Sequence, residues 1–224
     1  MPGDLRTSPN FITRFLRFFF FLIYEPFAWS YDLVAWIVSL GRWNSWVTST
    51  LPELPGPRVL ELGHGPGHLQ LALRQKGIRA FGIDRSAPMG RIASRRLRRA
   101  KVTPYLVRAK AEHLPFPINA FDQLVATFPS EYIIQPATLS EIKRLLANNG
   151  KVLILPVAWI RGNKLLDRAA AWLSRVTGQA PNWDPRFIEP LRRAGFFVKE
   201  KRIELLGSEV MLITASQSTN PLFG

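Results

Sequence analysis

Hydrophobic side chains along this chain fall into short runs and into stripes at helical spacing. Residues 59–62 and 79–84 form two largely apolar runs, which carry Glu61 and Asp84 respectively. Short runs of this kind are typical of buried strands. Residues 89–100 follow with apolar side chains at helical spacing, so we expect a helix that packs on a sheet. The positions expected to face that sheet are Met89, Ile92, Ala93, Leu97 and Ala100.

The pattern continues in the last third of the chain. Residues 162–177 place leucine, alanine and tryptophan at helical spacing, which predicts an inserted helix. A last helix is expected over 186–194. Two strands, at about 196–204 and 208–215, are then expected to close the sheet.

Residues 49–57 divide the chain into two parts. They contain three prolines, which disfavour the interior of a helix and the centre of a sheet, so we expect a linker. The predicted organisation is an N-terminal set of amphipathic, aromatic helices over 1–50 and an α/β domain over 51–224.

Three glycines at alternate positions, Gly63, Gly65 and Gly67, follow the first predicted strand. A strand, a glycine turn, a helix and a second strand that ends in an acid are the layout of a nucleotide-binding unit. In this unit Asp84 is placed to accept the ribose hydroxyls. The spacing differs from the G-x-G-x-x-G of dinucleotide folds, and Glu61 beside the turn suits an ammonium group better than a pyrophosphate.

Residues 61–67 resemble motif I of the class I S-adenosylmethionine-dependent methyltransferases, in which the glycine turn lies against the methionine part of the cofactor. Residues 109–117, 119–127 and 149–155 are similar, in order, to three further segments of that family. These are the adenine-lining segment, the loop with the fourth strand, and the turn with the fifth strand. The resemblance covers about residues 56–216 and is closest to the branch of quinone C-methyltransferases and some bacterial phospholipid methyltransferases.

The resemblance implies a Rossmann-like α/β fold with a mostly parallel seven-stranded sheet, helices on both faces and an N-terminal helical lid. It implies S-adenosylmethionine as the cofactor. The cofactor-binding residues that it implies are Glu61, Gly63, His64, Gly65, Gly67, Asp84, Arg85, Ala111, Glu112 and Thr127. Lys110 stands where the family usually has an acid that accepts from the adenine amino group. Because lysine cannot accept a hydrogen bond, we expect that contact from the backbone of Ala111 or from Glu112.

Methyl transfer requires alignment of donor and acceptor, exclusion of water and removal of one proton. Alignment supplies much of the acceleration, so a dedicated base is not obligatory. The candidates for a base are Glu131, His64 and Tyr31, and each can equally be a positioning or solvent-exposed residue. Glu131 follows the fourth strand, where this family places acceptor contacts, and Tyr31 with Asp32 resembles a Tyr-Asp pair in the N-terminal helices of the same branch.

The cysteine and histidine content excludes several kinds of site. The chain has 224 residues, 47% of them hydrophobic, no cysteine and three histidines. Disulfides, thiolate zinc sites and cysteine nucleophiles are therefore excluded. His64 and His68 lie four residues apart, but no carboxylate completes a ligand set at a sensible spacing, so no metal site is expected.

The formal net charge is +14, and it is unevenly distributed. One cluster of basic residues falls on the helix after the second strand: Arg91, Arg95, Arg96, Arg98, Arg99 and Lys101. This cluster is either a solvated helix face or a surface that attracts a polyanion, such as anionic lipid or nucleic acid. A nucleic-acid amino-methyltransferase is disfavoured, because residues 128–131 read Phe-Pro-Ser-Glu where its signature tetrad is expected.

Ten aromatic side chains lie within residues 11–31. Charged residues interrupt this stretch, so we expect short amphipathic helices at about 10–24, 27–40 and 42–49 rather than a membrane-spanning helix or a signal peptide. Aromatic residues with flanking arginines suit a membrane interface, and a lid over the catalytic domain explains them equally well. We therefore expect a cytoplasmic protein, with peripheral binding at the inner face of an anionic membrane as one of these two alternatives.

The leading hypothesis is a methyltransferase whose acceptor is a hydrophobic, membrane-resident small molecule or lipid. Two alternatives stay open. One is a methyltransferase for a soluble small molecule, and the other is a non-catalytic lipid-binding protein on the same fold.

Overall fold

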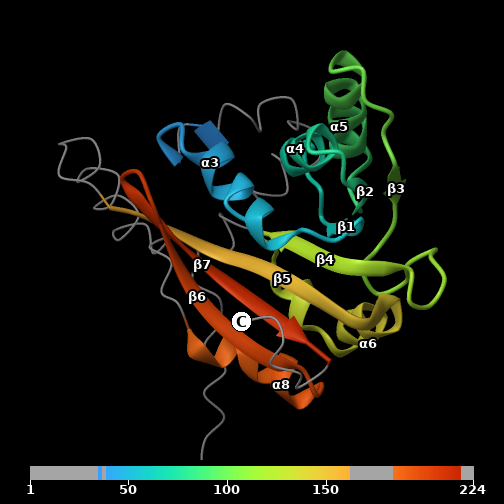
Figure 1. Cartoon of the computed structure of the whole chain (residues 1–224), viewed down its shortest axis with the longest axis vertical. Helices are drawn as coiled ribbons and strands as arrows, with labels where there is room; N and C mark the ends of the chain where they lie inside the picture. The colour runs from blue at the N-terminus through green and yellow to red at the C-terminus, as the bar shows by residue number, and fades with distance from the viewer. Residues whose placement is uncertain (1–34, 37–38, 162–183, 218–224) are drawn as a thin grey trace, which may run out of the picture.

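The computed structural model describes residues 35–36, 39–161 and 184–217 (Figure 1). The helices expected at 10–24 and 162–177 lie outside the described residues, and the one at 27–40 lies largely outside them. The helix expected at 42–49 is present as α3, Trp43–Thr48.

A seven-stranded sheet forms the centre of the molecule, with the strand order β3-β2-β1-β4-β5-β7-β6. Strands β1 to β5 pair in parallel, whereas β7 runs antiparallel to both β5 and β6. The order reverses at β1, from which the chain first builds toward β3 and then returns to add β4 on the other side. The expected Rossmann-like fold is confirmed. The strands are β1 Arg58–Leu62, β2 Arg79–Asp84, β3 Leu106–Arg108, β4 Phe121–Thr127, β5 Leu146–Ile160, β6 Phe197–Leu205 and β7 Ser208–Ser216.

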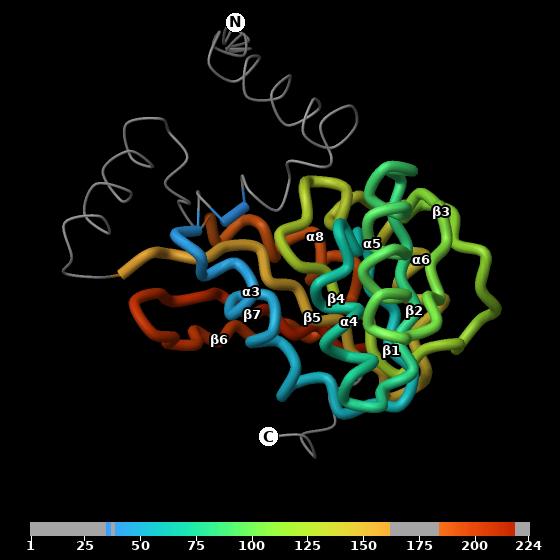
Figure 2. The backbone as a smooth tube through the Cα atoms, turned by 90° about the horizontal axis from the view of Figure 1, so that it is seen from above, coloured from blue at the N-terminus to red at the C-terminus, as the bar shows by residue number. Residues whose placement is uncertain are grey.

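Helices cover both faces of the sheet. The view in Figure 1 places α3, α4 and α5 on one side and α6 and α8 on the other. From above, Figure 2 shows α3 over β5 and β7, with α4 and α5 over β1 and β2. Besides α3, the helices are α4 His68–Gln75, α5 Ala87–Arg99, α6 Pro136–Leu145 and α8 Glu189–Arg193, with 3-10 turns η2 Leu51–Glu53, η3 Glu131–Ile134 and η4 Pro185–Ile188.

Alternate residues of the buried strands supply two hydrophobic cores. In β1, Val59 packs with α3 and α4, whereas Leu60 and Leu62 pack with α6 on the opposite face. All three side chains are fully buried. This alternation fixes the register of β1, because a slip by one residue would exchange the two faces.

Helix α5 follows its predicted pattern with two differences. Met89, Ala93 and Leu97 are buried, as expected, but Ile92 is only half-buried and Ala100 is exposed. Ala100 is the C-cap residue, so it lies beyond the last helical turn. At the other end, the Ser86 side chain accepts from Met89 N at 3.3 Å and caps the helix.

Two segments expected to connect elements are part of the sheet or are attached to it. The turn expected at Asn149-Gly150 lies inside β5, at a shift in its register with β4. Residues 49–57 are not a loose linker, since Leu54 is completely buried and Gln123 donates to Glu53 O and accepts from Gly56 N. These contacts attach the segment to the sheet.

Candidate functional site

A cavity of about 780 Å³ lies at the carboxyl ends of β1, β2 and β4. This is the edge at which ligands bind in open α/β sheets, next to the point where the strand order reverses. Its walls come from the glycine turn, the loop 109–112, the end of β4 and α3. The lining includes these residues expected from the sequence: Glu61, Gly63, His64, Gly65, Asp84, Arg85, Ala111, Glu112 and Thr127. Lys110 also lines it.

The Asp84 carboxylate holds the glycine turn in place. One oxygen accepts from Gly65 N at 2.8 Å, and the other accepts from Ser86 N at 2.8 Å. Gly65 has φ +50°, and a Cβ added there would meet nothing within 4 Å. A side chain at this position would therefore extend into open space at the edge of the cavity. The backbone at Gly65 is accessible to a ligand only because the residue has no side chain.

The other two glycines of the turn have different roles. A Cβ at Gly63 would lie 2.8 Å from the Tyr132 hydroxyl, so this glycine makes room for a protein side chain as well as lining the cavity. A Cβ at Gly67 would lie 2.8 Å from the Cβ of Ala93 in α5. Gly67 is absent from the cavity lining, and its contact with the cofactor stays a prediction. It allows the start of α4 to pack against α5.

Glu61 is a buried acid, with 1% of its surface exposed. Gln70 Nε2 donates to one of its oxygens at 2.9 Å. Burial is the main cause that raises the pKa of Glu61 to about 8, and the charge of Asp84 acts in the same direction. The carboxyl group is therefore mostly protonated at neutral pH in the free protein. A ligand ammonium placed beside it would favour the ionised form.

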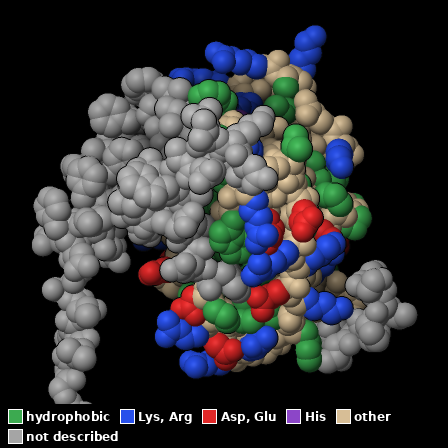
Figure 3. Space-filling view, turned by 90° about the vertical axis from the view of Figure 1, so that its left-hand side faces the viewer, with side chains coloured by type: hydrophobic (Ala, Val, Ile, Leu, Met, Phe, Trp, Pro, Cys, Tyr) green, Lys and Arg blue, Asp and Glu red, His purple; other side chains and the backbone are tan. Residues whose placement is uncertain are grey.

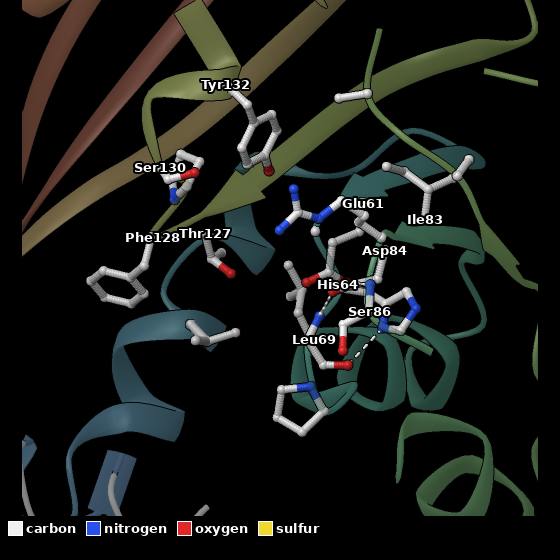
Figure 4. Close-up of a pocket in the computed structure, with 18 of the residues that line it drawn as sticks. Glu61, His64, Leu69, Ile83, Asp84, Ser86, Thr127, Phe128, Ser130 and Tyr132 are labelled. Carbon is white, nitrogen blue, oxygen red and sulfur yellow. Dashed lines mark hydrogen bonds between the residues drawn. The ribbon is translucent and has the colours of Figure 1, made fainter. Parts of the chain in front are cut away.

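His64 lies at the Asp84 end of the cavity. Its Nδ1 is 2.7 Å from the Gly65 carbonyl, and because a carbonyl oxygen only accepts, this nitrogen carries the hydrogen. Burial lowers the pKa of His64 despite the opposing effect of Asp84, so the ring is neutral at pH 7. Figure 4 shows His64 beside Asp84 and Ser86, on the opposite side from Phe128.

Aromatic side chains form the other end of the cavity. Phe128, at the end of β4, has φ +50° and stacks on Trp43 with ring centroids 4.6 Å apart. A positive φ is strained for a bulky residue, and here it coincides with contact between the Phe128 ring and α3. Tyr132 donates from its hydroxyl to Leu62 O at 3.1 Å and lies above the same end in Figure 4. Neither Trp43 nor Phe128 is among the site residues expected from the sequence.

The three candidates for a base differ in whether they line the cavity. His64 lines the cavity, whereas Glu131 is exposed at the start of η3 and is absent from the lining. The structure therefore does not bring Glu131 to the site. The residue of that turn that lines the cavity is its neighbour Tyr132. Tyr31 lies outside the described residues.

The described residues also bear on metal binding and on membrane-spanning helices. Within residues 35–36, 39–161 and 184–217, no three side chains of His, Cys, Asp or Glu gather in a way that could hold a metal ion. In the same ranges, no helix has the length and apolar character needed to cross a membrane.

Sequence comparison connects this cavity with a known activity. Residues 60–154 match the family described as a methyltransferase domain. The demethylmenaquinone methyltransferase of Symbiobacterium thermophilum is 30% identical over an alignment that covers 92% of this chain and 94% of that protein.

This chain belongs to the S-adenosylmethionine-dependent methyltransferases. Within them, its relatives place it in the branch of quinone methyltransferases. A second relative is the ubiquinone/menaquinone biosynthesis C-methyltransferase UbiE of Cupriavidus metallidurans, 29% identical over 72% of each chain. The protein is therefore a methyltransferase enzyme.

Solved structures of methyltransferases share the fold. A SAM-dependent methyltransferase from Thermotoga maritima superposes with a TM-score of 0.59 at 20% identity, covering 88% of this chain and 98% of that one. Phosphoethanolamine N-methyltransferase 2 of Haemonchus contortus, in complex with S-adenosyl-L-methionine, superposes with a TM-score of 0.55 at 17% identity. That match covers 80% of this chain and 53% of the Haemonchus chain. At these identities the likeness concerns the fold alone.

Proposed function

We propose that this methyltransferase binds S-adenosylmethionine with its methionine part at the glycine turn and its adenosine toward β2 and the loop 109–112. The buried Glu61 supports this orientation, because its carboxylate can pair with the ligand ammonium. The Asp84 carboxylate, at the end of β2, is in position to accept the ribose hydroxyls. Backbone and side-chain groups of Ala111 and Glu112 are available for adenine. When bound, the cofactor supplies an electrophilic methyl group.

The aromatic wall is the observation that points to the acceptor. Trp43, Val47 and Phe128 line the cavity opposite the Asp84 end, so an acceptor there would lie against apolar surface and stacked rings. Aromatic rings bind planar apolar molecules by offset stacking. The named relatives act in menaquinone and ubiquinone biosynthesis. We therefore assign the acceptor to hydrophobic ring compounds of the quinone-precursor kind, or to a lipid, rather than to a soluble small molecule.

Positioning and exclusion of water account for the chemistry that the described residues can supply. Tyr132 is held by its hydrogen bond to Leu62 O, and it lines the cavity with its hydroxyl next to Gly63. His64 is neutral and retains a lone pair on Nε2, so it can accept a proton, although it lies at the cofactor end. The role of Tyr31 as a base stays a prediction. These positions of Tyr132 and His64 fit a mechanism in which the enzyme aligns the methyl donor with the acceptor.

A hydrophobic acceptor implies a membrane source. The aromatic segment 11–31 and the arginines of α5 are the two features that support peripheral binding to an anionic membrane, at its inner face. Two weak signals together give stable binding where either alone is marginal. The acceptor would then enter the cavity from the bilayer.

Product mass tests the proposal. The protein is incubated with methyl-labelled S-adenosylmethionine and either a total lipid extract or the soluble metabolite fraction of the same cells. A labelled product in the lipid extract, lost in Trp43→Ala but retained in the exposed-site control Trp36→Ala, is the expected result. Label that appears only in the soluble fraction would reject the hydrophobic acceptor.

A further inference from the structure

A second, smaller cavity of about 440 Å³ lies between α5 and β3. It shares His64, Asp84 and Ser86 with the larger cavity and extends away from it along α5. Proteins often form ligand sites in such concave places, and their chemistry is set by a few convergent polar groups. The groups that converge here are arginines.

Three arginines of one helix face line this groove. Arg91, Arg95 and Arg98 are spaced i, i+4 and i+7, so they lie on one side of α5, and Arg108 of β3 lies across from them. The Nε of Arg108 donates to Arg85 O at 3.1 Å, which fixes the position of its side chain along the sheet edge. Four guanidinium groups from two elements therefore converge on one groove.

The three arginines of α5 in this groove have no ion-pair partner among the described residues. Within the described residues, Arg91, Arg95 and Arg98 contact no carboxylate, whereas Arg144 pairs with Glu141 and Lys201 pairs with Glu53. In Figure 3, Lys and Arg gather without Asp or Glu at the top of the view, whereas lower down they are interleaved with Asp and Glu.

A single acid lines the groove together with four arginines. Asp84 is the only carboxylate among the lining residues, and its two oxygens accept from Gly65 N and Ser86 N at the far end. Like charges held together repel one another, and an anion with more than one negative oxygen relieves this repulsion. Guanidinium groups bind phosphate through paired, charge-assisted hydrogen bonds.

Gly90 forms part of the groove floor and is a second, independent feature. It lies inside α5, where glycine destabilises a helix by about 1 kcal/mol relative to alanine. A Cβ at this position would meet nothing within 4 Å, so packing does not require a glycine there. Its effect is to leave the groove open between the arginines and the sheet edge.

We propose that this groove is a binding site for the phosphate group of a phosphomonoester or phosphodiester, next to the methyl-transfer site. Its size suits one phosphate with its ester substituent. A nucleic acid would need a longer row of phosphate contacts than a single groove provides. The ligand is therefore either a small soluble phosphate ester or the headgroup of an anionic lipid.

Binding of two probes to the full-length protein, without cofactor, tests the site and identifies the source. The soluble probe is glycerol 3-phosphate, followed by calorimetry. The membrane probe is a phosphatidylcholine vesicle that contains phosphatidylglycerol, followed by flotation. Binding of the soluble probe indicates a metabolite site, and binding of the vesicle alone indicates a lipid headgroup site. Either result supports the proposal when removal of the groove arginines weakens it, because the aromatic segment 11–31 and the net charge of +14 also favour an anionic vesicle.

Two variants separate the groove from general charge. The triple variant Arg91→Gln, Arg95→Gln, Arg98→Gln is expected to weaken binding by about ten-fold or more, because it removes charge-assisted hydrogen bonds. The control Lys76→Gln, Arg193→Gln, Lys199→Gln removes the same charge from exposed positions outside the groove and should change binding less than about two-fold. Gly90→Leu fills the groove without altering charge and should also abolish binding of the soluble probe, or weaken vesicle binding.

Equal losses in the two triple variants would overturn the proposal, as would wild-type binding by Gly90→Leu. Binding of an RNA oligonucleotide with neither probe bound would also overturn it. Thermal unfolding of each variant checks that the fold is intact. Because no cofactor or acceptor is used, these outcomes are independent of the proposed methyl transfer. The vesicle measurement alone shares the α5 arginines with the proposed membrane binding.

Discussion

Replacement of Glu61 by glutamine should stabilise the free protein, and the gain should grow as the pH rises. In wild type, the pKa of Glu61 is about 8 in the folded state, because the carboxyl group is buried. In the unfolded chain it returns to the ordinary value of 4.5. Folding therefore requires the carboxyl group to take up a proton between these two pH values, and wild-type stability falls as the pH rises through this window.

The difference between 4.5 and about 8 corresponds to about 5 kcal/mol, at 1.36 kcal/mol for each pH unit. The loss is about 1 kcal/mol at pH 5, about 3 kcal/mol at pH 7 and close to the full value at pH 9. Glutamine has no charge to desolvate. It also brings a donor to Gln70 Oε1, which is buried and has no hydrogen-bond partner among the described residues. The stability difference between Glu61→Gln and wild type should therefore increase by about 3 kcal/mol from pH 5 to pH 8.

Urea unfolding followed by tryptophan fluorescence, at several pH values between 5 and 9, measures this difference. Glu141→Gln is the matched control. Arg144 holds the pKa of Glu141 below its ordinary value through a hydrogen bond, so that group is ionised in both states across the window. Its variant should differ from wild type by a constant amount. A constant difference for Glu61→Gln as well would show that Glu61 is ionised in the folded protein and would refute the reasoning.

Three further predictions concern the cofactor. Affinity for S-adenosylmethionine should rise with pH up to about 8, and binding should release protons, because the ligand ammonium favours ionised Glu61. Calorimetry in buffers of different ionisation enthalpy measures the number of protons released. Binding without proton release would contradict the pairing of Glu61 with the ammonium group. Gly65→Leu should abolish cofactor binding while the protein stays folded at a cost of about 1–2 kcal/mol for the positive φ, and unchanged affinity would place the ligand elsewhere. Asp84→Ala should weaken binding by about 1.5–3 kcal/mol, as measured by calorimetry, and a smaller loss would remove Asp84 from the ribose contact.

The sequence was sufficient for the elements whose pattern is local. Strands β1 and β2, the glycine turn and α5 all follow from apolar spacing and from residues with special backbone needs. The turn at Asn149-Gly150 falls within the bounds of β5, because pairing with β4 resumes on both sides of it, at Leu146 and at Lys151, and such long-range pairing has no local signal. The same limit applies to residues 49–57, where side-chain contacts from Gln123 hold a proline-rich segment on the sheet.

The site was predicted as far as the motif extends along the chain. Alternate spacing treats the three glycines alike, and only the position of Ala93 in α5 shows that Gly67 serves packing. The order of residues after β4 suggests Glu131, but η3 begins there and leaves that side chain in solvent while Tyr132 enters the cavity. The stack of Phe128 on Trp43 joins segments far apart in sequence, and no local pattern identifies it.

The hydrogen bonds of Asp84 have a kinetic consequence. This carboxylate fastens the turn at Gly65 and the start of α5 through Ser86 before any ligand arrives. The entropy of ordering the binding loop is thus lost during folding rather than during association. The turn at Gly65 is then already in its hydrogen-bonded position when the cofactor arrives. A preorganised turn of this kind favours a high association rate constant. Differences in affinity among cofactor analogues should then lie mainly in their dissociation rates.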